Sequence, residues 1–155
     1  MRKEQTDRLR EIPPAVRILP MSAVKEFEGL SVKEVQRQFF LRDLLHRKTP
    51  GRYLYHKSGL QAPPGSVVLF QYSDFLVAEA RFQRSYRFLE PDEDYNGALY
   101  FDPKTIRVFD KIGSDVVSRI WPEFKGFSHV KWKKLDPKRY PVFEGKLKHV
   151  RTPKA

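Results

Sequence analysis

Hydrophobic and polar positions alternate most regularly in the middle of the chain, where residues 66–72 (SVVLFQY) and 75–85 (FLVAEARFQRS) flank Ser73-Asp74. In the second run, apolar side chains occupy positions 78, 80 and 82 and polar side chains occupy positions 79, 81 and 83. A period of two is typical of a strand with one buried face. The pattern predicts a β-hairpin whose second strand has one face toward solvent.

A helical period replaces this alternation in residues 30–48 (LSVKEVQRQFFLRDLLHRK). Ser31 followed three residues later by Glu34 has the form of a capping box. Val32, Val35, Phe39 and Leu44 are spaced for one buried face, and residues 49–51 (TPG) end the pattern.

The remaining patterns are shorter. Short apolar runs predict further strands at residues 15–21, 52–56, 98–102, 105–109 and 127–135, with Pro103-Lys104 as the turn between the third and fourth of these. Ser114 is expected to cap a helix at residues 115–121, and Asp136-Pro137 to open a final helix. Together these elements predict an α+β fold, a small curved sheet or β-barrel flanked by helices. We expect a charged lead-in (1–14), a single domain (15–150) and a basic tail (151–155).

Composition is consistent with one folded domain. The chain has 155 residues, of which 40% are hydrophobic, and it contains no cysteine. Disulfides, thiolate metal sites and cysteine nucleophiles are therefore excluded. No apolar run approaches the ~20 residues that span a bilayer, and the first residues lack the apolar core of a signal peptide. We expect a cytoplasmic protein without a membrane partner.

Charge adds a candidate partner. The formal net charge is +11, and residues 125–155 carry ten Lys and Arg against two acidic residues. A basic surface of this kind is typical of proteins that bind a polyanion, because contacts with phosphates release condensed counterions. A solvated basic face explains the same composition equally well.

The segment 127–141 (FSHVKWKKLDPKRYP) combines this charge with aromatic residues. Bases of unpaired or flipped nucleotides stack on aromatic faces while Lys and Arg contact the phosphates. The candidate pocket walls are Trp132, Trp121, Tyr55 and Tyr72, with Ser58 as a hydrogen-bond donor to the base. The candidate phosphate contacts are Lys131, Lys133, Lys134, Lys138 and Arg139. The alternative is that the tryptophans and tyrosines pack in the core.

Signals for catalysis are weak. Asp92 and residues 102–104 (DPK) match the letters of a nuclease metal motif, but a proline between the carboxylate and the lysine is more typical of a turn. The four histidines show no metal-ligand spacing. We therefore expect a protein that is not an enzyme and that needs no cofactor.

Three segments carry a resemblance to a known superfamily. Residues 64–85 (PGSVVLFQYSDFLVAEARFQRS), 105–120 (TIRVFDKIGSDVVSRI) and 135–147 (LDPKRYPVFEGKL) resemble, in order, parts of the EVE and ASCH families of the PUA-like superfamily. Ser66 stands where those families often have Asp, and residues 78–80 (AEA) where they often have Gly-x-Ala-Glu. The Trp-rich stretch and the Arg-Asn pair of EVE domains are absent, and RYLYHKSGLQAPP (52–64) stands in their place.

The resemblance implies a nucleic-acid-binding module whose cleft takes up a flipped, modified base, such as a methylated one. Similar modules, including YTH domains, read methylated bases in RNA, and others read modified DNA in restriction systems. We expect DNA slightly ahead of RNA, and an associated effector such as a nuclease or motor. One alternative is an ASCH-like hydrolase of a modified nucleoside or RNA, with Lys57 and Glu79 as the pair to examine. Another is an accessory protein that contacts RNA through charge alone.

Overall fold

The predicted hairpin is present, in a computed structural model that describes residues 12–21, 27, 29–55, 60–90, 95–127 and 133–153. Strand β3 (Val67–Tyr72) pairs antiparallel with β4 (Phe75–Arg87). Ser73 takes the left-handed conformation, with a φ of 57°, that this tight turn needs in the absence of a glycine. The expectation of a solvent-facing side is wrong at Glu79, which is 4% exposed because residues of the C-terminal helix cover it.

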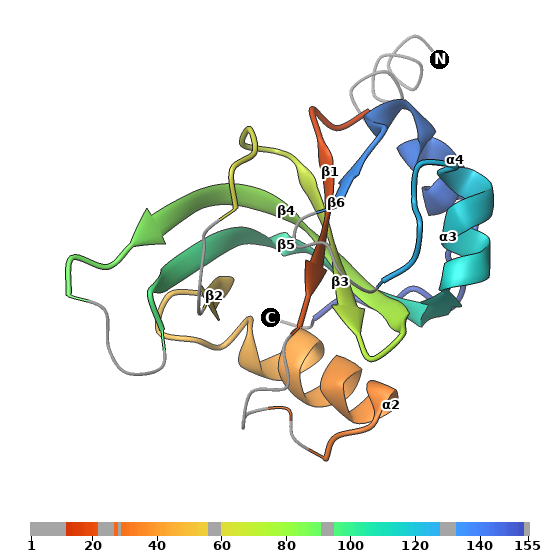
Figure 1. Cartoon of the computed structure of the whole chain (residues 1–155). Helices are drawn as coiled ribbons and strands as arrows, with labels where there is room; N and C mark the ends of the chain where they lie inside the picture. Colours follow the sequence, from red (N-terminus) through yellow and green to blue (C-terminus); the bar gives the residue numbers. More distant parts are fainter. Residues whose placement is uncertain are drawn as a thin grey trace, which may run out of the picture.

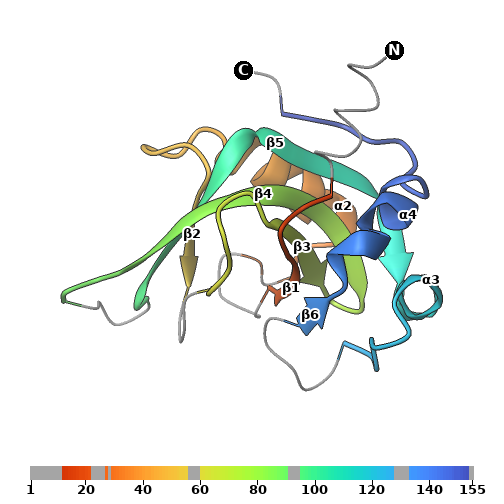
Figure 2. The ribbon, with the colours of Figure 1, turned by 90° about the horizontal axis from the view of Figure 1, so that it is seen from above.

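The hairpin lies within one six-stranded sheet of order β2-β5-β4-β3-β1-β6. Strand β1 runs parallel to β3, and the other neighbouring pairs are antiparallel. The other strands are β1 (Val16–Pro20), β2 (Arg52–Tyr55), β5 (Gly97–Gly113) and β6 (Lys133–Leu135). The helical segments are α2 (Val32–Glu34), the π-helix η2 (Val35–Asp43), α3 (Ser114–Ile120), the 3-10 helix η3 (Pro137–Arg139) and α4 (Tyr140–Glu144). The predicted α+β class, a curved sheet flanked by helices, is confirmed (Figures 1 and 2).

Strand β5 corrects the prediction of two strands joined at Pro103-Lys104. Arg107 faces Glu79 while Asp102 faces Arg81, so β5 accommodates extra residues between these pairs. The Thr105 hydroxyl donates to the Asp102 carbonyl (2.7 Å) and accepts from the Arg81 amide (2.8 Å), which replaces a ladder bond. Pro103 is tolerated because a bulge needs no amide donor there.

The N-terminal helix begins as predicted. The Ser31 amide donates to the Glu34 carboxylate (3.0 Å), and the Glu34 amide donates to the Ser31 hydroxyl (3.2 Å). From Val35 onward the helix is a π-helix. Gln36 is buried, and its Nε2 donates to the carbonyls of Val77 (2.9 Å) and Phe109 (2.6 Å). Both acceptors lie where the β4–β5 register shifts. A polar residue thus docks the helix on an irregularity of the sheet.

Two clusters of buried side chains form the core. The first lies between η2 and one face of the sheet and contains Phe39, Phe40, Tyr53, Phe70 and Phe101. The second lies under α3 and α4, around Trp121, Tyr140 and Phe143. In Figure 1, β4 and β5 run together away from α3 and α4, so one end of these strands forms an arm.

Of the two helix caps predicted in the C-terminal part, one is confirmed and one is wrong. Asp136 caps η3, because its carboxylate accepts from the Lys138 amide (3.0 Å). Ser114 is the first residue of α3 rather than its cap, and Gly113 precedes it without a side-chain bond. Of the strand predicted at 127–135, β6 is described. The backbone of Arg151 pairs with Val108 on β5, so folded structure continues into the expected tail.

Within the described parts of the chain, the helices are all too short or too polar to cross a membrane.

Candidate nucleic-acid interface

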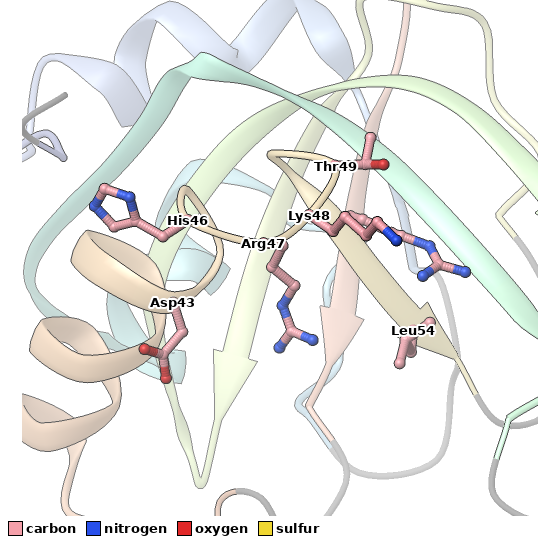
Figure 3. Close-up of a pocket in the computed structure, with 7 residues that line it drawn as sticks. Asp43, His46, Arg47, Lys48, Thr49 and Leu54 are labelled. Atoms are coloured by element: carbon pink, nitrogen blue, oxygen red, sulfur yellow. The ribbon is translucent and has the colours of Figure 1, made fainter.

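A basic cavity of about 500 Å³ lies between the end of η2 and the edge strand β2. Figure 3 shows its side chains on the helix end, the connection that follows, and β2. His46 and Lys48 are exposed, and Asp43 already accepts a 2.9 Å hydrogen bond from Arg42. Because Arg47, Lys48 and Arg52 outnumber this one carboxylate, the cavity is cationic. Its lining residues are Asp43, His46, Arg47, Lys48, Thr49, Arg52 and Leu54.

The connection that shapes this basic cavity depends on Gly51. This residue has a φ of +82°, and a Cβ atom there would lie 2.0 Å from the carbonyl oxygen of Phe101. The Gly51 amide donates to Leu44 (2.8 Å), and its carbonyl accepts from the Phe101 amide (2.9 Å). Close contact with β5 therefore requires glycine at this position. Gly51 thereby fixes the positions of the basic residues that precede and follow it in the sequence.

Two arginines of the basic cavity rest on aromatic rings. The guanidinium carbon of Arg47 lies 5.3 Å from the ring centroid of Phe39, and that of Arg52 lies 5.6 Å from Phe88. Cation–π contacts of this kind restrict a long side chain and leave its charge in place. The two guanidinium groups therefore keep their charge at the cavity while the side chains are already partly ordered.

A second polar cluster lies on the sheet beneath α4. The Arg107 Nε donates to Glu79 (2.8 Å), and the same arginine donates to Glu144 (2.6 Å) and to the Tyr140 hydroxyl (3.0 Å). Tyr140 in turn donates to Glu79 (2.8 Å). A smaller cavity of about 210 Å³ adjoins these groups and is also lined by Arg81 and Thr105. We call Glu79, Arg107, Tyr140 and Glu144 the buried cluster.

Burial controls the protonation of the buried cluster. It raises the pKa of Glu79, an effect that Arg107 and the Tyr140 hydroxyl oppose. Burial also raises the pKa of Tyr140, and Glu79 raises it further. For Arg107, burial lowers the pKa, but Glu79, Glu144 and Tyr140 together more than offset this and give a net rise. The groups satisfy one another and join β4, β5 and α4, which indicates a structural clamp.

The prediction that Trp121 is a wall of a base pocket is wrong. Its side chain is 0% exposed, its ring centroid lies 5.4 Å from that of Phe143, and its Nε1 donates to the Asp136 carbonyl (2.9 Å). A ring enclosed in this way offers no face to a base. Trp121 is a core residue, the alternative that the sequence had left open.

The two tyrosines predicted as pocket walls lie in a different part of the molecule. Tyr55 is 7% exposed and belongs to the core between η2 and the sheet. The Tyr72 hydroxyl donates to the carbonyls of Phe27 (2.9 Å) and Leu30 (2.6 Å), so it anchors the segment before α2. Trp121, Tyr55 and Tyr72 therefore do not form the walls of one pocket, because each contributes to packing.

Other predicted site residues stay predictions. Trp132, Ser58, Lys131 and Lys57 lie outside the described residues, and for Lys133 the structure describes the backbone in β6. Lys134, Lys138 and Arg139 are exposed, as phosphate contacts must be. They lie at or beyond the β6 edge, and the basic cavity lies at the β2 edge of the same sheet. Predicted and observed basic sites are thus separate in the strand order.

Sequence reasoning missed the basic cavity. Its cations come from residues 46–52 (HRKTPGR), a dense basic stretch at the end of the clearest predicted helix. That density was the available signal. The phosphate contacts were instead predicted in residues 125–155, where the excess of positive charge is larger.

Comparison with known proteins adds little. No family model matches the sequence, and no curated protein matches it. Among solved structures, the chain is similar to a mutant of ZmASCH from Zymomonas mobilis, with 10% identity and a TM-score of 0.49 over 85% of this chain and 98% of that chain. A likeness at this level transfers neither residues nor activity. Function therefore has to be inferred from the chain's own residues.

Proposed function

We propose that the protein binds nucleic acid, and that the basic cavity beside β2 contacts the phosphate backbone. The observation that supports this most is the convergence of Arg47, Lys48 and Arg52 around one opening, with two of them resting on aromatic rings. The net charge of +11 favours a polyanionic partner at long range. Lys134, Lys138 and Arg139 are additional phosphate contacts in this proposal.

The finer proposal is that the cavity admits a flipped, modified base. Its volume of about 500 Å³ lies within the range of small-ligand sites. Arginine planes stack on bases, so Arg47 and Arg52 take the role first given to Trp121 and Tyr55. We retain DNA ahead of RNA, and an associated effector such as a nuclease, as predictions from the sequence resemblance.

Fluorescence anisotropy with labelled oligonucleotides tests the coarser proposal. Lys48→Glu should weaken binding about 10-fold or more at about 50 mM salt, with a smaller effect at about 200 mM. Lys125→Glu is the matched control, because Lys125 is exposed and lies near α3 rather than in the cavity. Equal losses in the two variants would show that binding depends on total charge and would contradict a site beside β2.

Matched probes test the finer proposal. DNA and RNA carrying methylated adenine or cytosine, and their unmodified counterparts, are compared with wild type and with Arg52→Lys. A preference for a modified probe that persists at higher salt and disappears in Arg52→Lys is expected, since lysine keeps the charge but not the plane. Identical affinities for all probes in wild type would contradict recognition of a modified base.

The hydrolase alternative is supported by one observation, the buried carboxylate of Glu79 with its raised pKa beside a second cavity. Our proposal is a binding module without catalysis. Incubation with modified nucleosides and RNA, followed by chromatography, distinguishes the two. Turnover by wild type that Glu79→Gln abolishes without loss of nucleic-acid binding would favour the hydrolase.

A further inference from the structure

A row of side chains crosses three strands of the arm. Arg52 on β2 is the register partner of Tyr100 on β5, and Tyr100 is the partner of Arg84 on β4. Direct partners in a ladder project from the same face of a sheet. The guanidinium carbon of Arg84 lies 4.0 Å from the Tyr100 ring centroid. Planar cationic and aromatic groups therefore lie side by side on this face.

The row continues toward the outer end of β4. The rings of Tyr86 and Phe88 are 5.9 Å apart, and Tyr86 is 45% exposed. We call Arg52, Tyr100, Arg84, Tyr86 and Phe88 the arm platform. Arg84 is also exposed and Tyr100 is half-buried. The platform therefore offers two exposed planar groups, the ring of Tyr86 and the guanidinium of Arg84 that lies over Tyr100.

The described helices leave the arm platform open. Residues Tyr53 and Leu99, which alternate with platform positions on β2 and β5, point into the core beneath η2. The helix thus packs on the opposite face of the arm, and α3 and α4 lie at the other end of the long strands (Figures 1 and 2). An aromatic and arginine-rich face without such cover suits a ligand with flat rings and negative charge.

We propose that the arm platform stacks the bases of a single-stranded nucleic acid whose phosphates enter the basic cavity. Arg52 belongs to both surfaces, and Leu54, the next β2 residue on the platform face, also lines the cavity. One ligand can therefore occupy both. A single strand exposes its base faces, whereas a duplex buries them, so stacking selects the unpaired form. This inference rests on the coarser part of the proposed function, that the basic cavity contacts phosphates, and it specifies the form of the ligand.

Acidic residues follow the end of β4 in the sequence. Glu90 is exposed just after β4, and the sequence continues with Asp92, Glu93 and Asp94 before β5. Carboxylates repel the phosphates of a nucleic acid, because both are negatively charged. The bound nucleic acid should therefore cross the arm, with bases on Tyr86 and Arg84 and phosphates toward Arg52 and the cavity, rather than continue past the end of β4.

Anisotropy with a single strand of roughly 12 nucleotides, the matched duplex and a matched abasic strand tests the proposal. Wild type should bind the single strand more tightly than the other two. Tyr86→Ala should weaken binding of the single strand by about 5-fold or more and leave the affinity for the abasic strand unchanged. Tyr86→Phe should bind the single strand as wild type does. Val142→Ala is the control, because Val142 on α4 is 47% exposed and lies away from the arm. Circular dichroism verifies that each variant folds.

Two results separate this inference from the proposed function. If Lys48→Glu weakens binding while Tyr86→Ala equals wild type on the single strand, the platform is wrong and the basic cavity stands. If neither wild type nor any variant binds nucleic acid, both are wrong. A wild-type preference for the duplex would also overturn the platform.

Discussion

Arg107 on β5 and Glu79 on β4 are direct partners in the ladder, and the Arg107 Nε donates to the Glu79 carboxylate at 2.8 Å. The Glu79 side chain is 5% exposed and that of Arg107 is 29% exposed. Arg107 also reaches Glu144 on α4. An ion pair formed within the sheet thus attaches a short C-terminal helix to its surface.

Removing Arg107 should therefore destabilise the fold. Arg107→Met leaves the buried carboxylate of Glu79 without its cation, and we expect a loss of about 3 kcal/mol in the free energy of unfolding, measured in urea. Arg119→Met is the control, because its i,i+4 pair with Asp115 is largely exposed and should contribute well under about 1 kcal/mol. Equal effects of the two substitutions would contradict a structural clamp.

The pH dependence of the free energy of unfolding should reflect the protonation of Glu79. Burial raises its pKa above the ordinary value of 4.5, so the folded chain holds this proton more tightly than the unfolded chain. The resulting stabilisation is complete below about pH 4.5 and is lost as the pH rises through the folded pKa. In urea unfolding from about pH 3 to about pH 8, the stability of wild type relative to Glu79→Gln should therefore fall with rising pH.

Glu34→Gln supplies a control of opposite sign. Hydrogen bonds from the backbone and side chain of Ser31 lower the pKa of Glu34. Its contribution is present above about pH 4.5 and is lost as the pH falls through the folded pKa. The stability of wild type relative to this variant should rise with pH. The same sign for both variants would show that one of the two directions is wrong.

Gln36 should be required for docking of η2. Gln36→Leu leaves the buried carbonyls of Val77 and Phe109 without their donor, and we expect a loss of about 2 kcal/mol or more. Gln38 lies on the same helix and is half-buried. Gln38→Leu should therefore change the midpoint of thermal unfolding much less. A similar small shift for both would mean that solvent replaces the missing donor.

Gly51 should be required for the basic cavity. Gly51→Ala adds a Cβ atom 2.0 Å from Phe101 O, whereas Gly29→Ala adds one with no atom within 4 Å. Both residues have positive φ, so both variants lose about 1 kcal/mol to backbone strain. The clash should add about 2 kcal/mol or more for Gly51→Ala alone. Comparable melting temperatures for the two variants would contradict the close approach to β5.

Much of the fold could be predicted because its signals are local. The capping box of Ser31 and Glu34 and the cap at Asp136 involve residues within three positions of one another. The β3–β4 hairpin follows from alternation on either side of a two-residue turn. Pro103 misled the prediction, because a proline marks either a turn or a bulge, and the register with β4 decides between them.

The chain's sequence by itself determined the α+β class, most of the element positions and a surplus of positive charge, since period, caps and composition are written in neighbouring residues. Tertiary structure alone decided which aromatics are accessible. Trp121 and Tyr55 are enclosed, whereas Tyr86 is exposed, and no local pattern separates them. It also joined residues 46–52 with the arm into one surface, because Arg52 pairs with Tyr100 on β5 and rests on Phe88 just after β4. Burial and convergence depend on which distant segments pack together, and that is a property of the folded chain.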